Sequence, residues 1–145
     1  MPASPFWKTT RSSSERRAGS SGSPALAISS RISSGTAASA KDDLPGTLAQ
    51  VRTGDPVLLL VHEPDIFPRV PERVALTLAG HTHGGQIRLP FIWPAFVPSK
   101  FGKRFAYGHI VEDGRHMIVS GGLGTSVVPA RLGVPPEVVR IELGA

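Results

Sequence analysis

Two continuous apolar runs predict the centre of the fold. Residues 57–61 read Val-Leu-Leu-Leu-Val, and residues 74–79 read Val-Ala-Leu-Thr-Leu-Ala, without alternation of polar and apolar positions. A run of this kind is typical of a strand that is buried on both faces of a sheet. The pattern therefore predicts two short buried strands in the middle of the chain.

Weaker patterns predict the elements around these strands. Asp42 or Asp43 can cap a short helix over residues 44–51, whose first turn tolerates Pro45. Three later segments have the composition of surface elements: a loop with several prolines over 90–98, a hairpin around Asp113-Gly114, and an alternating strand over 137–143. Ordered structure is therefore expected to begin near Lys41.

The first 41 residues differ in composition from the rest of the chain. Twelve of the first 40 are serine and seven are alanine, and no helical or strand-like apolar period persists. Such a segment buries too little apolar surface to offset the entropy of ordering it, so residues 1–41 are predicted to be disordered. A solvated tail, a Ser- and Arg-rich transit peptide and a stretch that is not native coding sequence all remain compatible with this composition.

Charge and cysteine content restrict the classes of function. The net charge is +5, but residues 1–40 hold five basic side chains against one acidic, and residues 41–145 hold eleven against ten. The part expected to fold is thus nearly neutral, and no nucleic-acid partner is expected. The absence of cysteine excludes disulfides, zinc–thiolate sites and thiol catalysis. No apolar run approaches the roughly 20 residues that a transmembrane segment needs.

Three histidines follow the two predicted strands. His62 comes directly after the first, whereas His81 and His83 follow the second within the glycine-flanked stretch 80–86. Ligands of open α/β sheets bind beyond the carboxyl ends of the strands, and neutral imidazole is the commonest protein ligand for metal ions. If the strands are parallel neighbours, the histidines predict a metal site at this edge. The alternative is that unrelated histidines end two core strands.

Four blocks of sequence carry a family resemblance. They are Val61-His62-Glu63-Pro64-Asp65, residues 78–90, the glycine-rich residues 121–126, and Pro135-Pro136-Glu137-Val138. In this order they resemble the calcineurin-like metallophosphoesterase superfamily, and especially its bacterial branch of predicted phosphohydrolases. The resemblance extends over about residues 43–144.

The resemblance implies both a fold and a chemistry. The fold would be α/β (α+β), with residues 42–145 forming the C-terminal half of a four-layer α/β/β/α sandwich that contains a mixed sheet. Two divalent or trivalent ions of the Mn, Fe or Zn type would be bound, with His62 and His81 on one ion and His83 on the other. Such ions lie about 3.5–4 Å apart and clamp a phosphoester, which a metal-bridged hydroxide attacks. The implied substrate is a small-molecule or lipid-type phosphoester.

The match to the family is incomplete. Its members carry an upstream Asp-x-His, a Gly-Asp-x-x-Asp whose carboxylate bridges the ions, and a Gly-Asn-His-Glu/Asp with a catalytic histidine. None of these occurs in residues 1–61. We therefore expect a truncated phosphoesterase that lacks the N-terminal half of its domain, contains no catalytic residue of the family and is inactive alone. The alternative is a non-catalytic remnant or a binding protein without hydrolase activity.

Three polar residues near the histidines are weaker candidates for the site. Asp65 is a candidate to orient His62 or to cap a helical turn. Gln86 and Arg88 are candidates to contact the phosphate, although Arg88 also suits a solvated strand position. The glycine-rich residues 120–126 could cradle a phosphate with backbone N–H groups or form a tight turn.

The missing motifs suggest an explanation for the N-terminal composition. A bias toward Ser, Ala, Arg and Gly is what GC-rich DNA yields when it is read out of frame, so residues 1–41 are compatible with a frame-shifted gene model. Translation of the upstream DNA in all three frames tests this reading. The reading predicts that the three acidic and histidine motifs appear in another frame, and their absence from every frame would contradict it.

Overall fold

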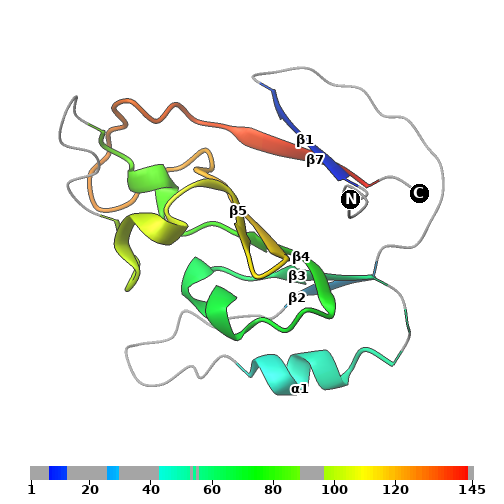
Figure 1. Cartoon of the computed structure of the whole chain (residues 1–145). Coiled ribbons are helices and arrows are strands. Elements are labelled where there is room, and N and C mark those ends of the chain that lie inside the picture. The colour runs from blue at the N-terminus through cyan, green and yellow to red at the C-terminus, as the bar shows by residue number, and fades with distance from the viewer. Residues whose placement is uncertain are drawn as a thin grey trace.

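The computed structural model describes most of the chain after residue 42 and two short segments before it. The described residues are 7–12, 26–29, 43–52, 54, 56–88 and 97–143. Figure 1 shows their arrangement, with a central sheet between a helix on one side and a two-stranded ribbon on the other. No helix among these residues is both long enough and apolar enough to cross a membrane.

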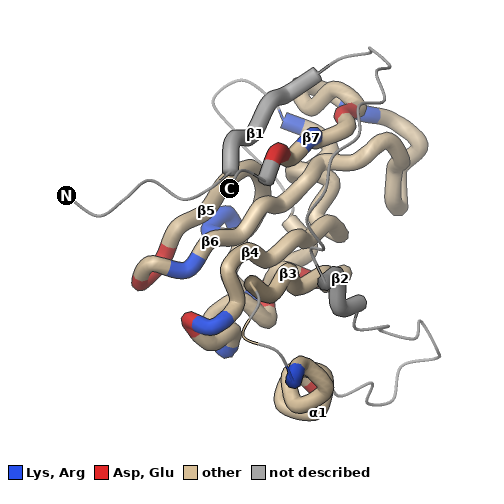
Figure 2. Tube along the Cα trace, turned by 90° about the vertical axis from the view of Figure 1, so that its right-hand side faces the viewer, with Lys and Arg blue, Asp and Glu red and all other residues tan. Residues whose placement is uncertain are grey.

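A mixed five-stranded sheet forms the centre, in the order β2-β3-β4-β6-β5. Four of its strands are parallel and β5 is antiparallel to β6. Their bounds are Leu26–Ser29 (β2), Val57–Leu60 (β3), Val74–Ala79 (β4), Gly108–Glu112 (β5) and Arg115–Val119 (β6). Strands β3, β4, β6 and β5 are seen side by side in Figure 2. The predicted α/β class with a mixed sheet is confirmed, and the two predicted buried strands, β3 and β4, are parallel neighbours.

The hydrophobic core is built from side chains of the sheet and of short helices that cover it. Leu59 of β3, Met117 of β6, and Phe67 and Phe105 of the 3-10 helices η1 (Pro64–Arg69) and η3 (Gly102–Phe105) have no exposed surface. They belong to one cluster of buried residues. Contacts between residues far apart in sequence therefore hold the sheet and the helices together.

The predicted helix is α1, Leu44–Ala49, which is two residues shorter than expected. Its N-cap is Asp43, whose carboxylate accepts a hydrogen bond from the Gly46 backbone N–H at 2.9 Å. Leu44 is buried, and Leu48 and Val51 pack against the core cluster. The helix is thus attached to the sheet by one apolar face.

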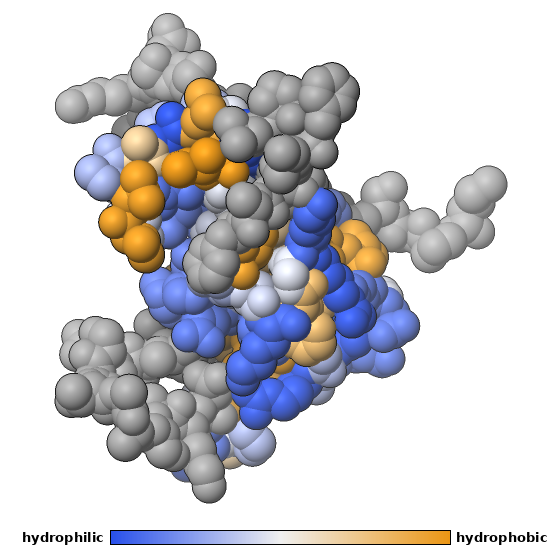
Figure 3. Space-filling view, turned by 90° about the vertical axis from the view of Figure 1, so that its left-hand side faces the viewer, coloured by the Kyte–Doolittle hydropathy of each residue, from blue (hydrophilic) through white to orange (hydrophobic). Residues whose placement is uncertain are grey.

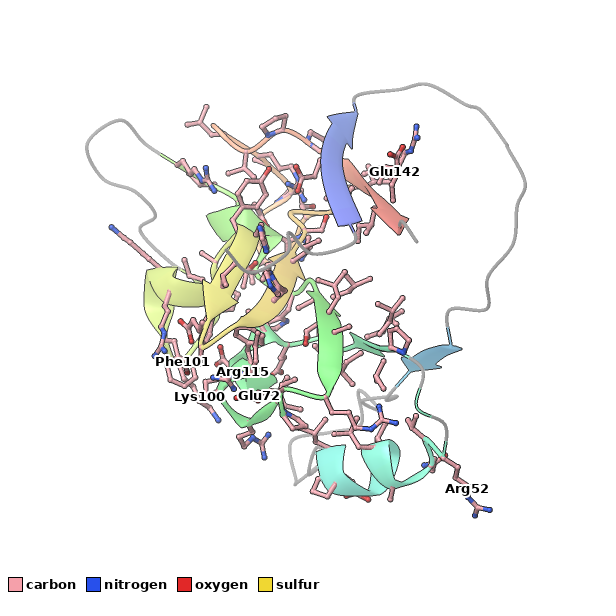
Figure 4. The ribbon with its side chains drawn as sticks, turned by 45° about the vertical axis from the view of Figure 1, so that its right-hand side comes forward. Arg52, Glu72, Lys100, Phe101, Arg115 and Glu142 are labelled. Atoms are coloured by element: carbon pink, nitrogen blue, oxygen red, sulfur yellow. The ribbon has the colours of Figure 1, made fainter. Side chains whose placement is uncertain are left out.

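Arg115 connects the β5–β6 hairpin to η1. Its Nη1 donates to the carbonyl oxygens of Phe67 and Val70 at 3.3 and 2.9 Å, and its Nη2 bonds Asp113 at 2.9 Å. Figure 4 shows Arg115 near this part of the chain. The predicted turn is present, because Asp113 and Gly114 both have positive φ, 50° and 75°. Arg115 therefore donates hydrogen bonds to carbonyl groups at the end of η1, where the last carbonyls of a helix lack partners within the helix.

A second sheet contains two strands. β7 (Val138–Leu143) pairs antiparallel with β1 (Trp7–Ser12), and both lie on the side of the main sheet opposite to α1 (Figure 1). β1 and β2 fall within the segment predicted to be disordered. The rest of residues 1–41, and residues 89–96 of the predicted proline-containing loop, lie outside the described residues.

Replacement of Phe67 by alanine tests the core. The ring is fully buried and makes an edge-to-face contact with Phe105, with centroids 5.8 Å apart. We expect Phe67→Ala to lower the free energy of unfolding by about 3–5 kcal/mol, because it removes buried apolar surface and leaves a cavity. Urea unfolding measures the change. Val111→Ala, at a site that is 52% exposed, is the control, and equal effects of the two substitutions would contradict this core.

Candidate metal centre

Parallel pairing brings the ends of β3 and β4 to one edge of the sheet. Leu60 pairs with Leu78, and the ladder continues beyond the strands, where the Val61 N–H donates to the Leu78 carbonyl at 2.9 Å. The Gly80 N–H then donates to the His62 carbonyl at 3.2 Å. The backbone therefore holds His62 and His81 next to each other.

The imidazoles of His62 and His81 converge. His62 Nε2 lies 3.0 Å from His81 Nδ1, and the rings are inclined at 66° with their centroids 4.8 Å apart. The separation is that of an N–H···N hydrogen bond, and it also suits two ligands of one ion. Two nitrogens that each bind an ion at about 2.0–2.1 Å can be no more than roughly 4 Å apart. The pair thus fits as two of the ligands of a metal ion.

Thr82 fixes the loop between the two histidines of the second block. It is buried, and its hydroxyl donates to the Ala106 carbonyl at 2.7 Å while the hydroxyl oxygen accepts from the Gly84 N–H at 3.4 Å. His81 and His83 on either side have positive φ, 67° and 50°. Such values are uncommon in residues other than glycine. The fold therefore holds both histidines in unfavourable backbone conformations, which are found most often at functional sites.

Packing explains why residue 84 is a glycine. Its φ is +64°, and a Cβ placed there would lie 2.8 Å from Val134 and 3.0 Å from Tyr107. Only glycine fits this position without displacement of its neighbours. The glycine after His83 thus allows the loop to approach the C-terminal part of the chain.

His83 lies near the pair but does not complete a three-residue site. Among the residues that the structure describes, no group of three or more His, Asp or Glu side chains is placed to hold a metal ion. The pKa of His83 is lowered, first by burial and then by the Arg131 guanidinium, with smaller contributions from His81 and His62. A neutral imidazole is the form that can bind a metal. The division of the three histidines between two ions stays a prediction.

Arg131 holds the glycine-rich segment against the histidine loop. Its guanidinium donates to the carbonyl oxygens of Gly121 and Gly124, and to that of Val134 at 3.3 Å. Its Nη2 is also 3.4 Å from His83 Nδ1. No motif in the sequence singled out this arginine, because its partners are backbone carbonyls whose positions depend on the fold.

Gln86 and Arg88 bond to protein groups in this structure. The Gln86 side-chain amide donates to the carbonyls of Val128 and Ala130, and its oxygen accepts from the Ser126 N–H at 2.8 Å. Arg88 Nε donates to the Gly84 carbonyl at 3.1 Å, and its guanidinium carbon lies 4.8 Å from the centre of the Tyr107 ring. Both side chains therefore support the loops around the histidines, and a contact with phosphate stays a prediction.

Asp65 bonds to a turn after the proline-containing loop. Its carboxylate accepts from the Ser99 hydroxyl at 2.6 Å and from the Lys100 N–H at 2.7 Å. These partners belong to the turn that leads into η3. A role for Asp65 in orienting His62 stays a prediction.

Glu137 is a buried carboxylate that the sequence did not single out as a functional residue. It is 9% exposed, and it accepts from the Tyr107 hydroxyl at 2.5 Å and from the Gly121 N–H at 2.9 Å. It therefore fixes the start of the glycine-rich segment and the ring over which Arg88 lies. The preceding prolines mark a loop but do not indicate these partners.

The fold is that of an α/β protein, and its two converging imidazoles lie beyond the carboxyl ends of parallel strands, where open α/β sheets bind their ligands. No family model matches the chain, and no solved structure matches it. Several curated proteins, however, are similar to it in sequence. It is 40% identical over 102 residues to YkuE, an uncharacterized metallophosphoesterase of Bacillus subtilis, covering 70% of this chain and 35% of the relative.

Two further relatives agree. The phosphodiesterase YaeI of Escherichia coli is 39% identical over 89 residues, covering 61% of this chain and 32% of the relative. An uncharacterized metallophosphoesterase of Aquifex aeolicus is 36% identical over 96 residues, covering 66% of this chain and 36% of the relative. The chain belongs to the metallophosphoesterase family. It spans about a third of the length of these relatives, in their C-terminal portion.

The lowered pKa of His83 predicts a pH dependence of stability. Because the pKa in the folded state lies below the ordinary 6.5, the unfolded chain binds more protons as pH falls through this value. The free energy of unfolding should therefore decrease below about pH 6.5 and be highest above it. We expect His83→Asn to weaken this decrease in urea unfolding at pH 7.5 and 5.5 with a chelator present. An identical pH dependence of the two proteins would contradict the lowered pKa.

Proposed function

We propose that the chain provides one side of a dinuclear metallophosphoesterase site. His62 and His81 would hold one ion, and His83 would bind the second. The observation that carries the proposal is the 3.0 Å separation of the His62 and His81 nitrogens at the sheet edge. These histidines also lie in the segment that is shared with relatives named as metallophosphoesterases or as a phosphodiesterase.

The residues of this chain would bind and orient, and the ions would supply the reactive chemistry. When bound, two ions of the Mn, Fe or Zn type provide Lewis acidity and a nucleophile at neutral pH. Imidazole ligands suit these metals. Thr82 and Gly84 fix the histidine loop, whereas Arg131 holds the glycine-rich segment beside it. The substrate is proposed to be a phosphoester.

The remaining ligands are proposed to lie outside the described residues. The described part contains no third ligand placed with the histidine pair and no carboxylate that could bridge two ions there. The relatives are about three times as long as the matched segment. We therefore propose that the chain is inactive alone. The same observation favours the second candidate function, a non-catalytic protein with at most a binding role.

A chimera tests this proposal. Residues 1–42 would be replaced by the upstream part of the Bacillus subtilis relative, and hydrolysis of bis(p-nitrophenyl) phosphate would be measured with Mn²⁺. We expect the chain alone to be indistinguishable from buffer and the chimera to be active. His81→Ala in the chimera should reduce the rate by at least about 100-fold, because even the loss of a group that only supports a ligand costs 10- to 100-fold.

The control is His109→Ala. His109 is exposed on β5 and belongs to the other histidine pair of the hairpin, with His116, so its removal should leave the rate unchanged. Hydrolysis by the unmodified chain would contradict the proposal that this chain lacks part of the site and is inactive alone. A folded but inactive chimera, or full activity of His81→Ala, would contradict the assignment of the histidines.

A further inference from the structure

The segment after the glycine-rich residues exposes four large apolar side chains. Leu123, Val127, Val128 and Leu132 are 66%, 96%, 44% and 53% exposed, and we call them the apolar rim. Figure 3 views the molecule from the side on which this segment lies and shows exposed apolar side chains gathered in its upper part. Exposed apolar groups that lie together commonly mark a binding surface.

The apolar rim is held in place at two points. The Gln86 side-chain NH2 group donates to the carbonyls of Val128 and Ala130, and its oxygen accepts from the Ser126 N–H. Arg131 binds the carbonyl of Gly124, next to Leu123. An amide and a guanidinium thus fix the backbone while the apolar side chains project outward. A surface of this kind loses little conformational entropy when a ligand binds.

The backbone at the tip of the rim is strained. Val127 has φ of +63°, a value that is a clear outlier for a β-branched residue. The Val127 side chain is 96% exposed, so burial of this side chain does not offset the cost of the backbone conformation. Strain that the surrounding bonds maintain, without a packing benefit, is characteristic of segments with a function.

The rim borders the histidine site. Both anchors belong to or contact the short loop from His83 to Gln86, because Gln86 ends this loop and Arg131 Nη2 lies 3.4 Å from His83 Nδ1. The guanidinium groups of Arg131 and Arg88 are directed at carbonyl oxygens or an aromatic ring. The described residues therefore present an apolar surface next to the loop that carries His83.

We propose that the apolar rim binds the organic group of the substrate, and that this group is an alkyl chain. The inference rests on the proposed phosphoesterase function, to which it adds the class of phosphoester. The phosphate would be held at the histidines, and the chain would lie along Leu123, Val127 and Val128. The continuity of the rim with the histidine loop favours this occupant over a partner that binds elsewhere on the surface.

Binding of alkyl phosphates tests the inference. Inorganic phosphate and ethyl, butyl, hexyl and octyl phosphate would be titrated by calorimetry into the full chain, with and without Mn²⁺ and below micellar concentrations. We expect the affinity to rise by roughly two- to fourfold for each added methylene, as burial of apolar surface requires. Val127→Ser/Val128→Ser should abolish this rise. Gln86→Glu should also weaken it, because a carboxylate cannot donate to the Val128 and Ala130 carbonyls.

Val111→Ser is the matched control, since Val111 is an exposed valine on β5, and it should preserve the dependence on chain length. An affinity that does not change with chain length would overturn the inference, and so would a rise that the double variant retains. Binding to phosphatidylcholine vesicles without binding to monomeric octyl phosphate would also overturn it, in favour of a membrane surface. Failure of the proposed function is distinguishable, because it would appear as phosphate binding that does not depend on Mn²⁺.

Discussion

Parallel pairing of β3 with β4 is the constraint on which the histidine site depends. The two strands are adjacent and almost wholly apolar. After an irregularity between Val57 and Leu58 their pairing runs regularly to Leu60 and Leu78, so that the residues following them emerge side by side. His62 and His81 are 19 positions apart in sequence, yet their nitrogens lie 3.0 Å apart. A shift of one residue in this register would point the side chains to opposite faces. Burial of β3 and β4 therefore determines the geometry of a polar site that lies outside the core.

The loops around the histidines form a second layer of support. Thr82, Gln86 and Arg131 all bond to backbone carbonyls, and together they connect the histidine loop to the η3 region and to the glycine-rich segment. Glu137 adds a buried carboxylate that fixes Gly121 and Tyr107. These bonds maintain positive φ at His81 and His83. Gln86, a candidate for contact with phosphate, thus also holds the backbone of the neighbouring segment.

The sequence predicts what depends on local pattern, and less of what depends on contacts between distant residues. Uninterrupted apolar runs predict β3 and β4, and the Asp113-Gly114 pair predicts the hairpin, all of which are present. The sequence leaves the cap of α1 open between Asp42 and Asp43, and Asp43 is the residue that caps it. The position of His62 and His81 shortly after these two strands predicts that the two side chains lie close together. By contrast, the bonds from Gln86 to Ala130, from Gly121 to Glu137 and from Arg131 to Gly121 span 44, 16 and 10 positions in sequence. No spacing rule can indicate such partners.

The central claim is that His62 and His81 bind the same metal ion. X-ray absorption at the zinc edge, on the chain loaded with one equivalent of Zn²⁺, tests it most directly. The account predicts two imidazole nitrogens at about 2.0–2.1 Å from each zinc ion, and one after His81→Ala. Zinc that is not retained, that has only oxygen neighbours, or that keeps the same neighbours in the His81→Ala variant would contradict the claim.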